Sequence, residues 1–336
     1  MVGNILITGA GGYIGSITTY ILLQHGYNIV ALDNFSTGYF QPLEFLQRKF
    51  GKNKLHIIKT DITDDISSIF VQERRISTVV HFAARCSVDE SMKNPEIYFL
   101  NNVIGTQNLL STMIQYDVKR IVFSSTCAVY GKMQYSPVDE RHPTIPINPY
   151  GESKLMTEQM IQWYGKIRGL RYVILRYFNV CGASDDGILG DSKKPSTLLV
   201  QNAVRGALDI DPFYLTCLKV NTPDKTPIRD YINVMDISEA HINALKYLYK
   251  GKANTTINLG TGTGNSVLEI IHTVQNITGK EFQILNAKPR LGEYPKMIAS
   301  IEKAKKLLNW QPKHLLKDSV NSLVSWYTKH PNGWKY

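Results

Sequence analysis

The chain has 336 residues, of which 43% are hydrophobic and 20% are charged, a composition typical of a globular protein with a sizeable core. No apolar run approaches the roughly 20 residues that a membrane span requires, and no basic segment precedes the apolar residues 4–8. These features argue against a membrane protein and against a secretory signal. The net charge of +10 would suit a nucleic-acid partner, but the basic residues are dispersed, so we expect none; a positive field also favours a phosphate-bearing small substrate.

The four cysteines are Cys86, Cys127, Cys181 and Cys217, which lie far apart and form no Cys-x-x-Cys pair. This spacing predicts neither a metal site nor a disulfide framework. Unpaired cysteines fit a reducing compartment, so we expect a cytoplasmic protein.

The first predicted strand, residues 4–8, runs into the glycine-rich stretch Thr8-Gly9-Ala10-Gly11-Gly12-Tyr13-Ile14-Gly15. A helical pattern follows to about residue 24, and a second strand, residues 28–32, ends at Asp33. Strand, glycine turn, helix, strand and acid in this order are the signature of a dinucleotide-binding unit. The glycines let the backbone approach a pyrophosphate, whose charge the helix N-terminus stabilises. Because Asp33 would bind ribose hydroxyls and repel a 2′-phosphate, we expect NAD rather than NADP.

A third strand is predicted at residues 55–58, and Asp61 follows it. The carboxylate of Asp61 could contact the adenine amino group of the cofactor. It could equally cap a helix that starts near Asp64, and both interpretations stay open.

A fourth strand, residues 78–82, runs into Ala83-Ala84, where small side chains either let the chain pass close to a cofactor or serve packing. A long helix is then predicted over residues 96–116. It contains Asn101 and Asn102, and because asparagine is unfavourable inside helices, we expect one of them to form a buried hydrogen bond.

A fifth strand, residues 120–124, ends in Ser124, Ser125 and Thr126. Open parallel sheets bind ligands at the carboxyl ends of their strands, so these hydroxyls could bind a substrate oxygen. They could also satisfy the backbone of the turn, as serines at strand ends commonly do.

Tyr150 and Lys154 lie four residues apart at the start of an apolar-periodic run, so they project from one face of a predicted helix. A neighbouring ammonium favours the phenolate and should lower the tyrosine pKa from its usual value of about 10. The pair is therefore a candidate general base for an alcohol, provided that another group accepts a hydride. By itself the pair could also be a chance arrangement on an exposed helix.

A sixth strand, residues 170–175, completes an alternation of strands and helices that predicts an α/β fold with one doubly wound parallel sheet. After residue 183 the pattern changes to short mixed elements. We therefore expect a dinucleotide-binding domain over residues 1–183 and a smaller mixed α/β substrate domain over 184–336, with chain exchange around residues 228–260. In the second part the expected strands are residues 213–216, 228–232 and 256–259, and the expected helices are 197–207, 237–249, 267–278, 301–308 and 317–327.

Together these motifs resemble the extended short-chain dehydrogenase/reductase superfamily, and within it the nucleotide-sugar 4-epimerases of the UDP-glucose 4-epimerase type. The resemblance covers residues 4–334. Its more epimerase-like parts are Tyr177-Phe178-Asn179 followed by Gly182-Ala183, and the run from Arg229 to Asp236.

The resemblance implies an isomerase with bound NAD that interconverts UDP-glucose and UDP-galactose. Tyr150 as phenolate takes the proton from the sugar 4-hydroxyl, Thr126 binds the 4-oxygen, and Lys154 lowers the Tyr150 pKa and holds the nicotinamide ribose. A hydride passes from sugar C4 to NAD, the 4-keto sugar rotates, and the hydride returns to its other face.

The resemblance also implies two sets of binding residues. Those for NAD are Gly9, Gly12, Tyr13, Ile14, Gly15, Asp33, Asn34, Asp61, Ile62, Phe82, Ala83, Ala84, Asn101, Ser124, Tyr150, Lys154 and Tyr177. Those for the UDP-sugar are Thr126, Tyr150, Asn179, Leu198, Arg229, Arg290, Glu293 and Met297. Arg229 could bind the diphosphate as a guanidinium fork or could be a structural arginine paired with Asp230 or Asp236.

Two positions depart from the family pattern. Cys86 stands where the family has a lysine that contacts cofactor phosphate, and Arg85 beside it would point elsewhere. Met297 stands at the family position that gates the sugar pocket, where a large aromatic residue excludes N-acetyl groups; methionine is flexible and of intermediate size.

Other functions of this fold remain as alternatives. The 4,6-dehydratases and decarboxylases of the superfamily carry acidic residues after the strand-end threonine, where this chain has Cys127-Ala128. A non-catalytic NAD-binding protein would have no need of Thr126, Tyr150 and Lys154 together. A 4-epimerase for UDP-N-acetylglucosamine, UDP-xylose or UDP-glucuronate is a further alternative. By the same resemblance we expect a homodimer formed through the helices near residues 96–116 and 150–168.

Overall fold

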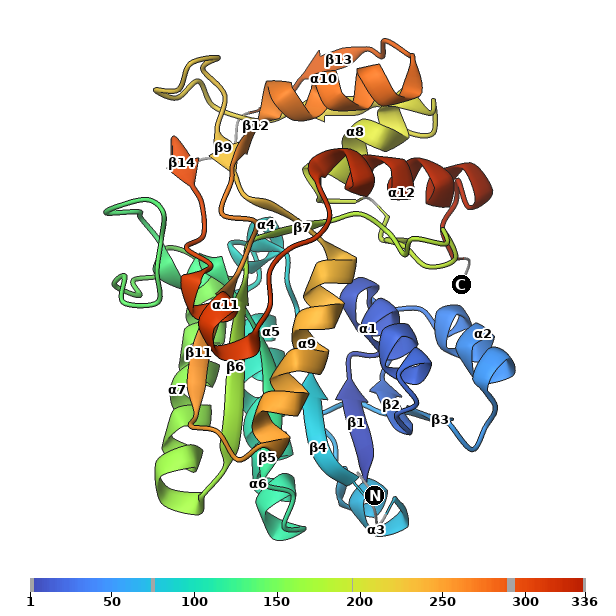
Figure 1. Ribbon diagram of the computed structural model, residues 1–336, viewed down its shortest axis with the longest axis vertical. Coiled ribbons are helices and arrows are strands. Elements are labelled where there is room, and N and C mark those ends of the chain that lie inside the picture. Colours follow the sequence, from blue (N-terminus) through green and yellow to red (C-terminus); the bar gives the residue numbers. More distant parts are fainter. Residues whose placement is uncertain (1–2, 74–75, 195, 289–293, 335–336) are drawn as a thin grey trace.

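The computed structural model describes residues 3–73, 76–194, 196–288 and 294–334, and a parallel sheet of seven strands lies at its centre (Figure 1). The strands are β1 (Asn4–Thr8), β2 (Ile29–Asp33), β3 (Leu55–Lys59), β4 (Ile76–His81), β5 (Arg120–Thr126), β6 (Arg171–Tyr177) and β11 (Thr255–Leu259). Their order, β11-β6-β5-β4-β1-β2-β3, reverses at β1, as in a doubly wound dinucleotide-binding sheet. The predicted fold class is confirmed, and the seventh strand comes from the second half of the chain.

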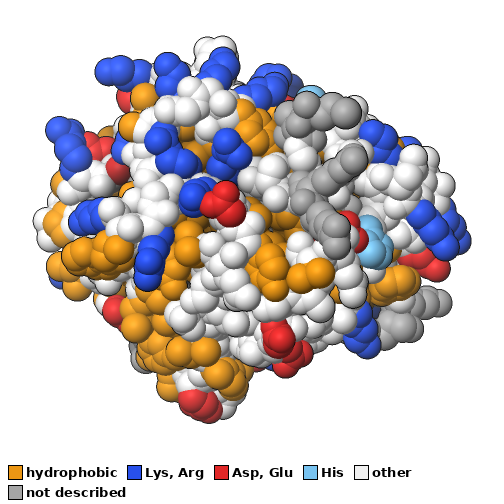
Figure 2. Space-filling view, turned by 90° about the horizontal axis from the view of Figure 1, so that it is seen from below, with side chains coloured by type: hydrophobic (Ala, Val, Ile, Leu, Met, Phe, Trp, Pro, Cys, Tyr) orange, Lys and Arg blue, Asp and Glu red, His pale blue; other side chains and the backbone are white. Residues whose placement is uncertain are grey.

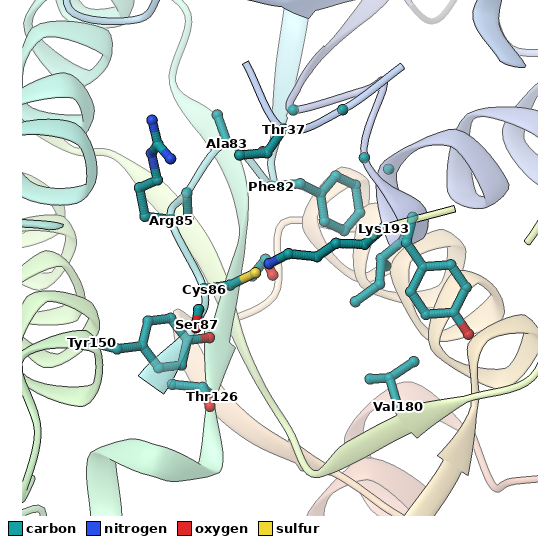
Figure 3. Close-up of a pocket in the computed structure, with 18 of the residues that line it drawn as sticks. Thr37, Phe82, Ala83, Arg85, Cys86, Ser87, Thr126, Tyr150, Val180 and Lys193 are labelled. Carbon is teal, nitrogen blue, oxygen red and sulfur yellow. The ribbon is translucent and has the colours of Figure 1, made fainter. Parts of the chain in front are cut away.

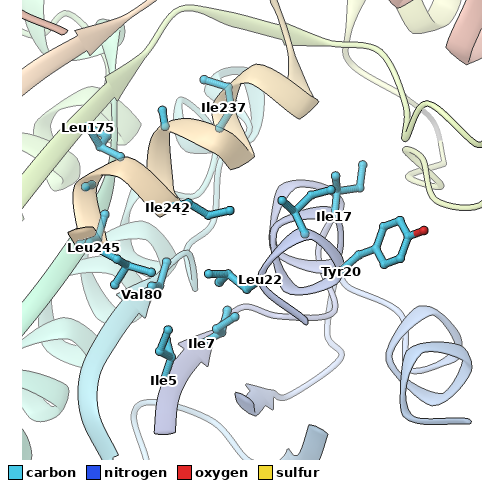
Figure 4. Close-up of a cluster of buried hydrophobic side chains, with 14 of the residues drawn as sticks. Ile5, Ile7, Ile17, Tyr20, Leu22, Val80, Leu175, Ile237, Ile242 and Leu245 are labelled. Atoms are coloured by element: carbon cyan, nitrogen blue, oxygen red, sulfur yellow. The ribbon is translucent and has the colours of Figure 1, made fainter. Parts of the chain in front are cut away.

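Helices cover both faces of the sheet because its strands are hydrophobic on both sides. Ile5 and Ile7 belong to the core on one face, whereas Leu6 between them belongs to the core on the other. The first face is covered by α1 (Tyr13–Gln24), α2 (Gln41–Phe50) and α9 (Val234–Tyr249), as Figure 4 illustrates for α1 and α9. The second face is covered by α3 (Ser67–Gln72), α6 (Gly105–Gln115) and α7 (Pro149–Arg168). The period of two in the strand sequence thus places a core on each side of the sheet.

The local sequence determines where α7 begins and ends. Asn148 accepts a hydrogen bond from the Gly151 amide at 2.8 Å, and Pro149 occupies the first helical position, where its missing N–H costs nothing. Gly169 ends the helix with a positive φ of 70°, which glycine adopts without strain. The cap at Asn148 positions the first turn of α7, which carries Tyr150.

The helix predicted over residues 96–116 is present, but its middle is widened. It consists of α5 (Pro95–Tyr98), the π-helical segment η1 (Phe99–Ile104) and α6. Within η1, the buried Asn102 accepts from the Arg85 amide and donates to the Ser153 hydroxyl at 3.0 Å. The expectation that one of the two asparagines forms a buried hydrogen bond is confirmed, and this bond joins η1 to α7.

The second half forms a smaller unit over the carboxyl edge of the sheet (Figure 1). Its helices are α8 (Leu199–Ala207), α10 (Val267–Thr278) and α12 (Leu316–Lys329), whereas α11 (Glu302–Leu308) packs against β11 and α9 on the first face of the sheet. Its strands are β7 (Asn179–Cys181), β8 (Phe213–Leu215), β9 (Ile228–Arg229), β10 (Tyr231–Asn233), β12 (Asn265–Ser266), β13 (Ile284–Asn286) and β14 (Lys296–Met297). Two short helices, α4 (Val88–Ser91) and η2 (Cys127–Tyr130), follow β4 and β5 in the chain. Among the described residues, no helix combines the length and the apolar character that crossing a bilayer demands.

Three local predictions need correction. The strand expected over residues 228–232 is two strands in separate sheets, because Asp230 between them is buried and accepts backbone hydrogen bonds from the amides of Thr261, Gly262 and Ala299. The helix expected near Asp64 begins only at Ser67. The amphipathic helix α2 was not predicted at all.

Candidate active site

A cavity of about 600 Å³ lies at the carboxyl edge of the sheet and is lined by residues from both halves of the chain (Figure 3). Every residue that the sequence predicted for the site and that the structure describes lines this single cavity. Arg290 and Glu293 lie outside the described residues. That residues so far apart in the sequence meet in one cavity could not be established from the sequence alone.

The glycine turn at the start of α1 admits no side chains at two positions. A Cβ atom on Gly9, whose φ is 69°, would lie 2.5 Å from the Ala83 amide nitrogen, and one on Gly15 would lie 2.1 Å from the Gly9 carbonyl oxygen. No side chain caps α1. A helix N-terminus with close backbone and no capping side chain suits a phosphate group.

Asp33 ends β2 beside this turn and is buried. Its carboxylate accepts hydrogen bonds from the amides of Gly11 at 2.8 Å and Phe35 at 2.7 Å, while burial raises its pKa. Each carboxylate oxygen can accept a further bond, so Asp33 keeps capacity for ribose hydroxyls. Asn34 donates to Asp61 at 2.5 Å, and Asp61 also accepts from the Thr63 amide. Asp61 therefore shapes the turn before α3 and lines the cavity, and it does not cap the helix itself.

Thr126 and Tyr150 face the same part of the cavity (Figure 3). Thr126 ends β5 and accepts a hydrogen bond from the Ala128 amide at 3.1 Å, and Tyr150 stands in the first turn of α7. One turn later the buried Lys154 lies with its ammonium 4.5 Å from the centre of the Phe123 ring. The spacing of four residues between Tyr150 and Lys154 thus brings both side chains to one cavity.

The net shift of the Tyr150 pKa is opposite in direction to the one predicted. Burial raises the pKa of Tyr150 above its usual value, and the Thr126 hydroxyl opposes this rise only in part. Burial also lowers the pKa of Lys154 to about 8, against the charge of Glu158, which raises it. In the protein alone, burial outweighs any lowering of the Tyr150 pKa by Lys154 because a phenolate in this cavity loses its hydration; the expectation that Lys154 lowers this pKa stays a prediction.

A buried ion pair behind the trio was missed by sequence reasoning. Glu158 accepts from Arg176 through two bonds, 2.9 Å from Nε and 2.5 Å from an Nη atom, and also from the Ser125 hydroxyl. The Arg176 guanidinium lies 4.8 Å from the centre of the Tyr130 ring. The pair joins α7, β5 and β6 beneath the active residues. Its only sequence signal is that Glu158 follows Lys154 by one helical turn.

A buried histidine orients the predicted cofactor contact Tyr177. The Nδ1 atom of His241 donates to the Ile237 carbonyl at 2.9 Å, so Nε2 must accept from the Tyr177 hydroxyl, 2.6 Å away. The ring of His241 also lies 4.7 Å from that of Phe82, centre to centre. His241 thereby holds two cavity-lining aromatic residues, a role for which the sequence carries no signal.

The predicted substrate residues that are described lie at the other end of the cavity. Arg229 donates to the carbonyls of Ile228 and Tyr294, at 2.9 Å and 2.8 Å. Asp230 and Asp236 instead accept bonds from other groups, and no described ion pair joins either to Arg229. The charge of Arg229 is thus left for a ligand. Met297 lies on β14, directly opposite Arg229 in the ladder with β9.

The departure from the family pattern at Cys86 is visible in Figure 3. Cys86 lines the cavity, and the Arg85 guanidinium turns from it toward Glu90, 3.8 Å away (Figure 3). The expectation that Arg85 points elsewhere is confirmed. Among the described residues, no cluster of His, Cys, Asp and Glu side chains could hold a metal ion.

Comparison with known proteins supports this reading of the cavity. Residues 5–260 match the model of the NAD dependent epimerase/dehydratase family. A UDP-glucose 4-epimerase from Halalkalibacterium halodurans is 41% identical, with 98% of this chain and 97% of that protein aligned. A UDP-arabinose 4-epimerase from Arabidopsis thaliana is 36% identical over 99% of this chain and 81% of its own length. Among solved structures, the UDP-glucose 4-epimerase from Bifidobacterium longum with NAD⁺ and UDP superposes with a TM-score of 0.93 at 33% identity, over 98% of this chain and 100% of that one.

Proposed function

The chain belongs to the NAD dependent epimerase/dehydratase family, and we propose that it is a UDP-sugar 4-epimerase that interconverts UDP-glucose and UDP-galactose. One observation carries the proposal: Thr126, Tyr150 and Lys154 line the same cavity as the glycine turn and Arg229. A base for a sugar hydroxyl, a dinucleotide cradle and a guanidinium for the diphosphate are the parts that this reaction needs.

NAD fits the residues present. The uncapped start of α1 would hold the diphosphate, Asp33 would accept from the ribose hydroxyls, and Tyr177 would contact the nicotinamide end. NAD supplies the acceptance and return of a hydride at sugar C4, with no net oxidation.

The protein's own residues handle the proton. Tyr150 takes it from the 4-hydroxyl and returns it to the 4-oxygen when the hydride reaches the opposite face of C4, and the Thr126 hydroxyl holds the 4-oxygen. Since burial raises the Tyr150 pKa, the phenolate needs positive charge close by, and Lys154, one helical turn along α7 and lining the same cavity, can give it. Arg229 grips the UDP diphosphate at the far end of the cavity.

A 4,6-dehydratase is the second candidate that the fold allows. Elimination of water needs an acid and a base after the strand-end threonine, where this chain has Cys127 and Ala128. Burial raises the pKa of the Cys127 thiol to about 12, so it exchanges no proton near neutral pH. Ala128 has no ionisable group, and the epimerase is therefore the better supported reaction.

The first experiment uses purified protein with no cofactor added. We expect it to convert UDP-galactose to UDP-glucose and to release NAD when it is denatured. Tyr150→Phe should lose turnover by a factor of about 10²–10⁴ and keep its NAD, because only the proton transfer is removed. Wild-type protein that releases NAD but converts neither sugar would rule out the UDP-glucose reaction, and the N-acetyl, pentose and uronic-acid substrates would then be tested.

We also propose that the active form is a homodimer in the cytoplasm. Leu100 and Ile104 on η1, and Met156, Trp163 and Ile167 on α7, are large apolar residues exposed at helical spacing. Figure 2 shows hydrophobic side chains gathered on the left of the molecule, the side on which Figure 1 places α7. Pairing of two copies would cover them. Light scattering of Trp163→Asp should give the mass of a monomer, and an unchanged dimer would place the interface elsewhere.

The four free cysteines support the cytoplasmic assignment.

A further inference from the structure

A short segment of the second half, residues 191–194, is held against the cavity from several sides. The indole of Trp326 on α12 donates to the Asp191 carbonyl at 3.1 Å. The hydroxyl of Tyr39 donates to the Ser192 carbonyl at 2.7 Å, and the amide of Trp334 donates to the Ser192 hydroxyl at 3.1 Å. The backbone that precedes Lys193 is therefore anchored by α12, by the segment after β2 and by the C-terminal tail.

The same anchors relate Lys193 to the glycine turn. The Tyr39 amide donates to the Gly11 carbonyl at 2.9 Å, so one residue joins the turn at α1 to the segment that carries Lys193. The Lys193 amide itself donates to the buried carboxylate of Asp191 at 3.2 Å. The Cα atom of Lys193 is thus held at a set position beside the turn that would bind the cofactor diphosphate.

The side chain of Lys193 points into the cavity. It is half-buried, and Figure 3 shows it reaching across the cavity toward Cys86. Within the described part of the chain, no hydrogen bond or ion pair engages its ammonium. The next residue, Lys194, is exposed and donates to the Asn332 side chain at 2.8 Å. Burial raises the pKa of the Asp191 carboxyl and the charge of Lys193 opposes this rise, but no hydrogen bond or ion pair among the described residues fixes the ammonium, so a cation partly removed from water can bind an anion in the cavity.

The other cations that line the cavity are directed elsewhere. Arg85 faces Glu90 and lowers the pKa of Asp61 by its charge. Lys154 lies against Phe123, and Arg229 is at the substrate end near Tyr294. Position 86, at which the family pattern has a lysine, brings no cationic group. Among the described cations that line the cavity, Lys193 is thus the one whose backbone is anchored to the glycine turn.

We propose that Lys193 is the countercharge for the diphosphate of NAD, brought across the cavity from the second half of the chain to the region of Cys86. The inference rests on the proposed function, because it takes the dinucleotide as the ligand. Its physical basis is the charge-assisted hydrogen bond between an ammonium and a phosphate oxygen. The cofactor would consequently be held from two sides, by the turn at α1 and by a segment fixed to the C-terminal tail.

The test compares Lys193→Met with the neighbouring control Lys194→Met. The readouts are NAD released per mole of purified protein, the Kd for NADH from its fluorescence in protein freed of nucleotide, and the KM for UDP-galactose. We expect Lys193→Met to weaken NADH binding about 10- to 100-fold at low salt, the value of one hydrogen bond to a charged group, and Lys194→Met to leave it unchanged. The difference should shrink at high salt because the interaction is electrostatic.

Two further variants separate charge from folding. Lys193→Arg should retain most of the affinity, and Cys86→Lys added to Lys193→Met should restore it, since the charge then returns from the opposite wall. Unchanged NADH binding in Lys193→Met, or a raised KM for UDP-galactose with NADH binding intact, would overturn the inference alone. Wild-type protein that binds no NAD would overturn the proposed function and this inference together.

Discussion

His241 offers a quantitative test of how the cavity wall is held. Its ring is fully buried, and burial lowers its pKa to about 4, whereas a histidine in the unfolded chain titrates near 6.5. The unfolded state therefore takes up the proton first as the pH falls. Stability due to the neutral ring is fully present above about pH 6.5 and is lost as the pH falls toward 4. When the pH is lowered from 7.5 to 5.0, protonation of His241 in the unfolded state should lower the unfolding free energy of the wild type by about 2 kcal/mol.

The substitution His241→Phe preserves the packing against Phe82 but removes the acceptor for the Tyr177 hydroxyl. At pH 7.5 we expect the variant to be less stable than the wild type by about 1–3 kcal/mol, the cost of an unsatisfied buried hydroxyl. At pH 5.0 the variant has no histidine at position 241 to protonate, so the gap should close by about 2 kcal/mol or reverse. His81, whose pKa burial lowers to about 3, acts equally in both proteins and cancels.

The assay is urea unfolding of both proteins at pH 7.5 and pH 5.0, at one NAD concentration, with the slope of each transition compared. His272→Phe on the exposed side of α10 is the matched control for replacing a histidine by phenylalanine. A gap for His241→Phe that stays constant to within about 0.5 kcal/mol would refute the assignment of a neutral, proton-excluding His241.

Three further predictions concern the ion pair, the turn and the sugar pocket. Glu158→Gln should lower the unfolding free energy by about 3–5 kcal/mol in urea titrations because Arg176 is left buried and unpaired, and a loss under about 1 kcal/mol would contradict this. Gly15→Ala should reduce the NAD retained after gel filtration by roughly tenfold, since its Cβ would meet the Gly9 carbonyl at 2.1 Å; full retention would mean that the turn adjusts freely. Met297→Tyr should lower kcat/KM for UDP-N-acetylglucosamine by roughly tenfold relative to UDP-glucose, and an equal effect on both sugars would place the gate elsewhere.

The first half of the fold was predictable because its signals are local. The strands recur with a period of two between helices with a period of 3.6, and the ends of α7 are set by Asn148, Pro149 and Gly169. The missed helix α2 follows β2 after a short loop; its amphipathic pattern, with Leu43 and Leu46 buried, is present in the sequence and was overlooked.

The second half was less predictable because its strands, apart from β11, are two or three residues long and exist only through their partners. Residues 228–232 read as one strand, yet Asp230 is drawn inward by amides from residues 261, 262 and 299. Such contacts, between segments far apart in the chain, leave no periodic pattern in the sequence.

The sequence by itself determined which chemical groups the site would contain. The glycine turn, Asp33, Thr126 and the pair Tyr150 and Lys154 are defined by spacing within one strand end or one helical turn, and the cavity gathers all of them. Only the tertiary structure decided the sign of the Tyr150 pKa shift, because burial depends on everything that surrounds the phenol. It also decided which lysine reaches into the cavity. Lys193 and Lys194 are identical neighbours in sequence, and the anchors on Ser192 turn one of them inward and leave the other in water.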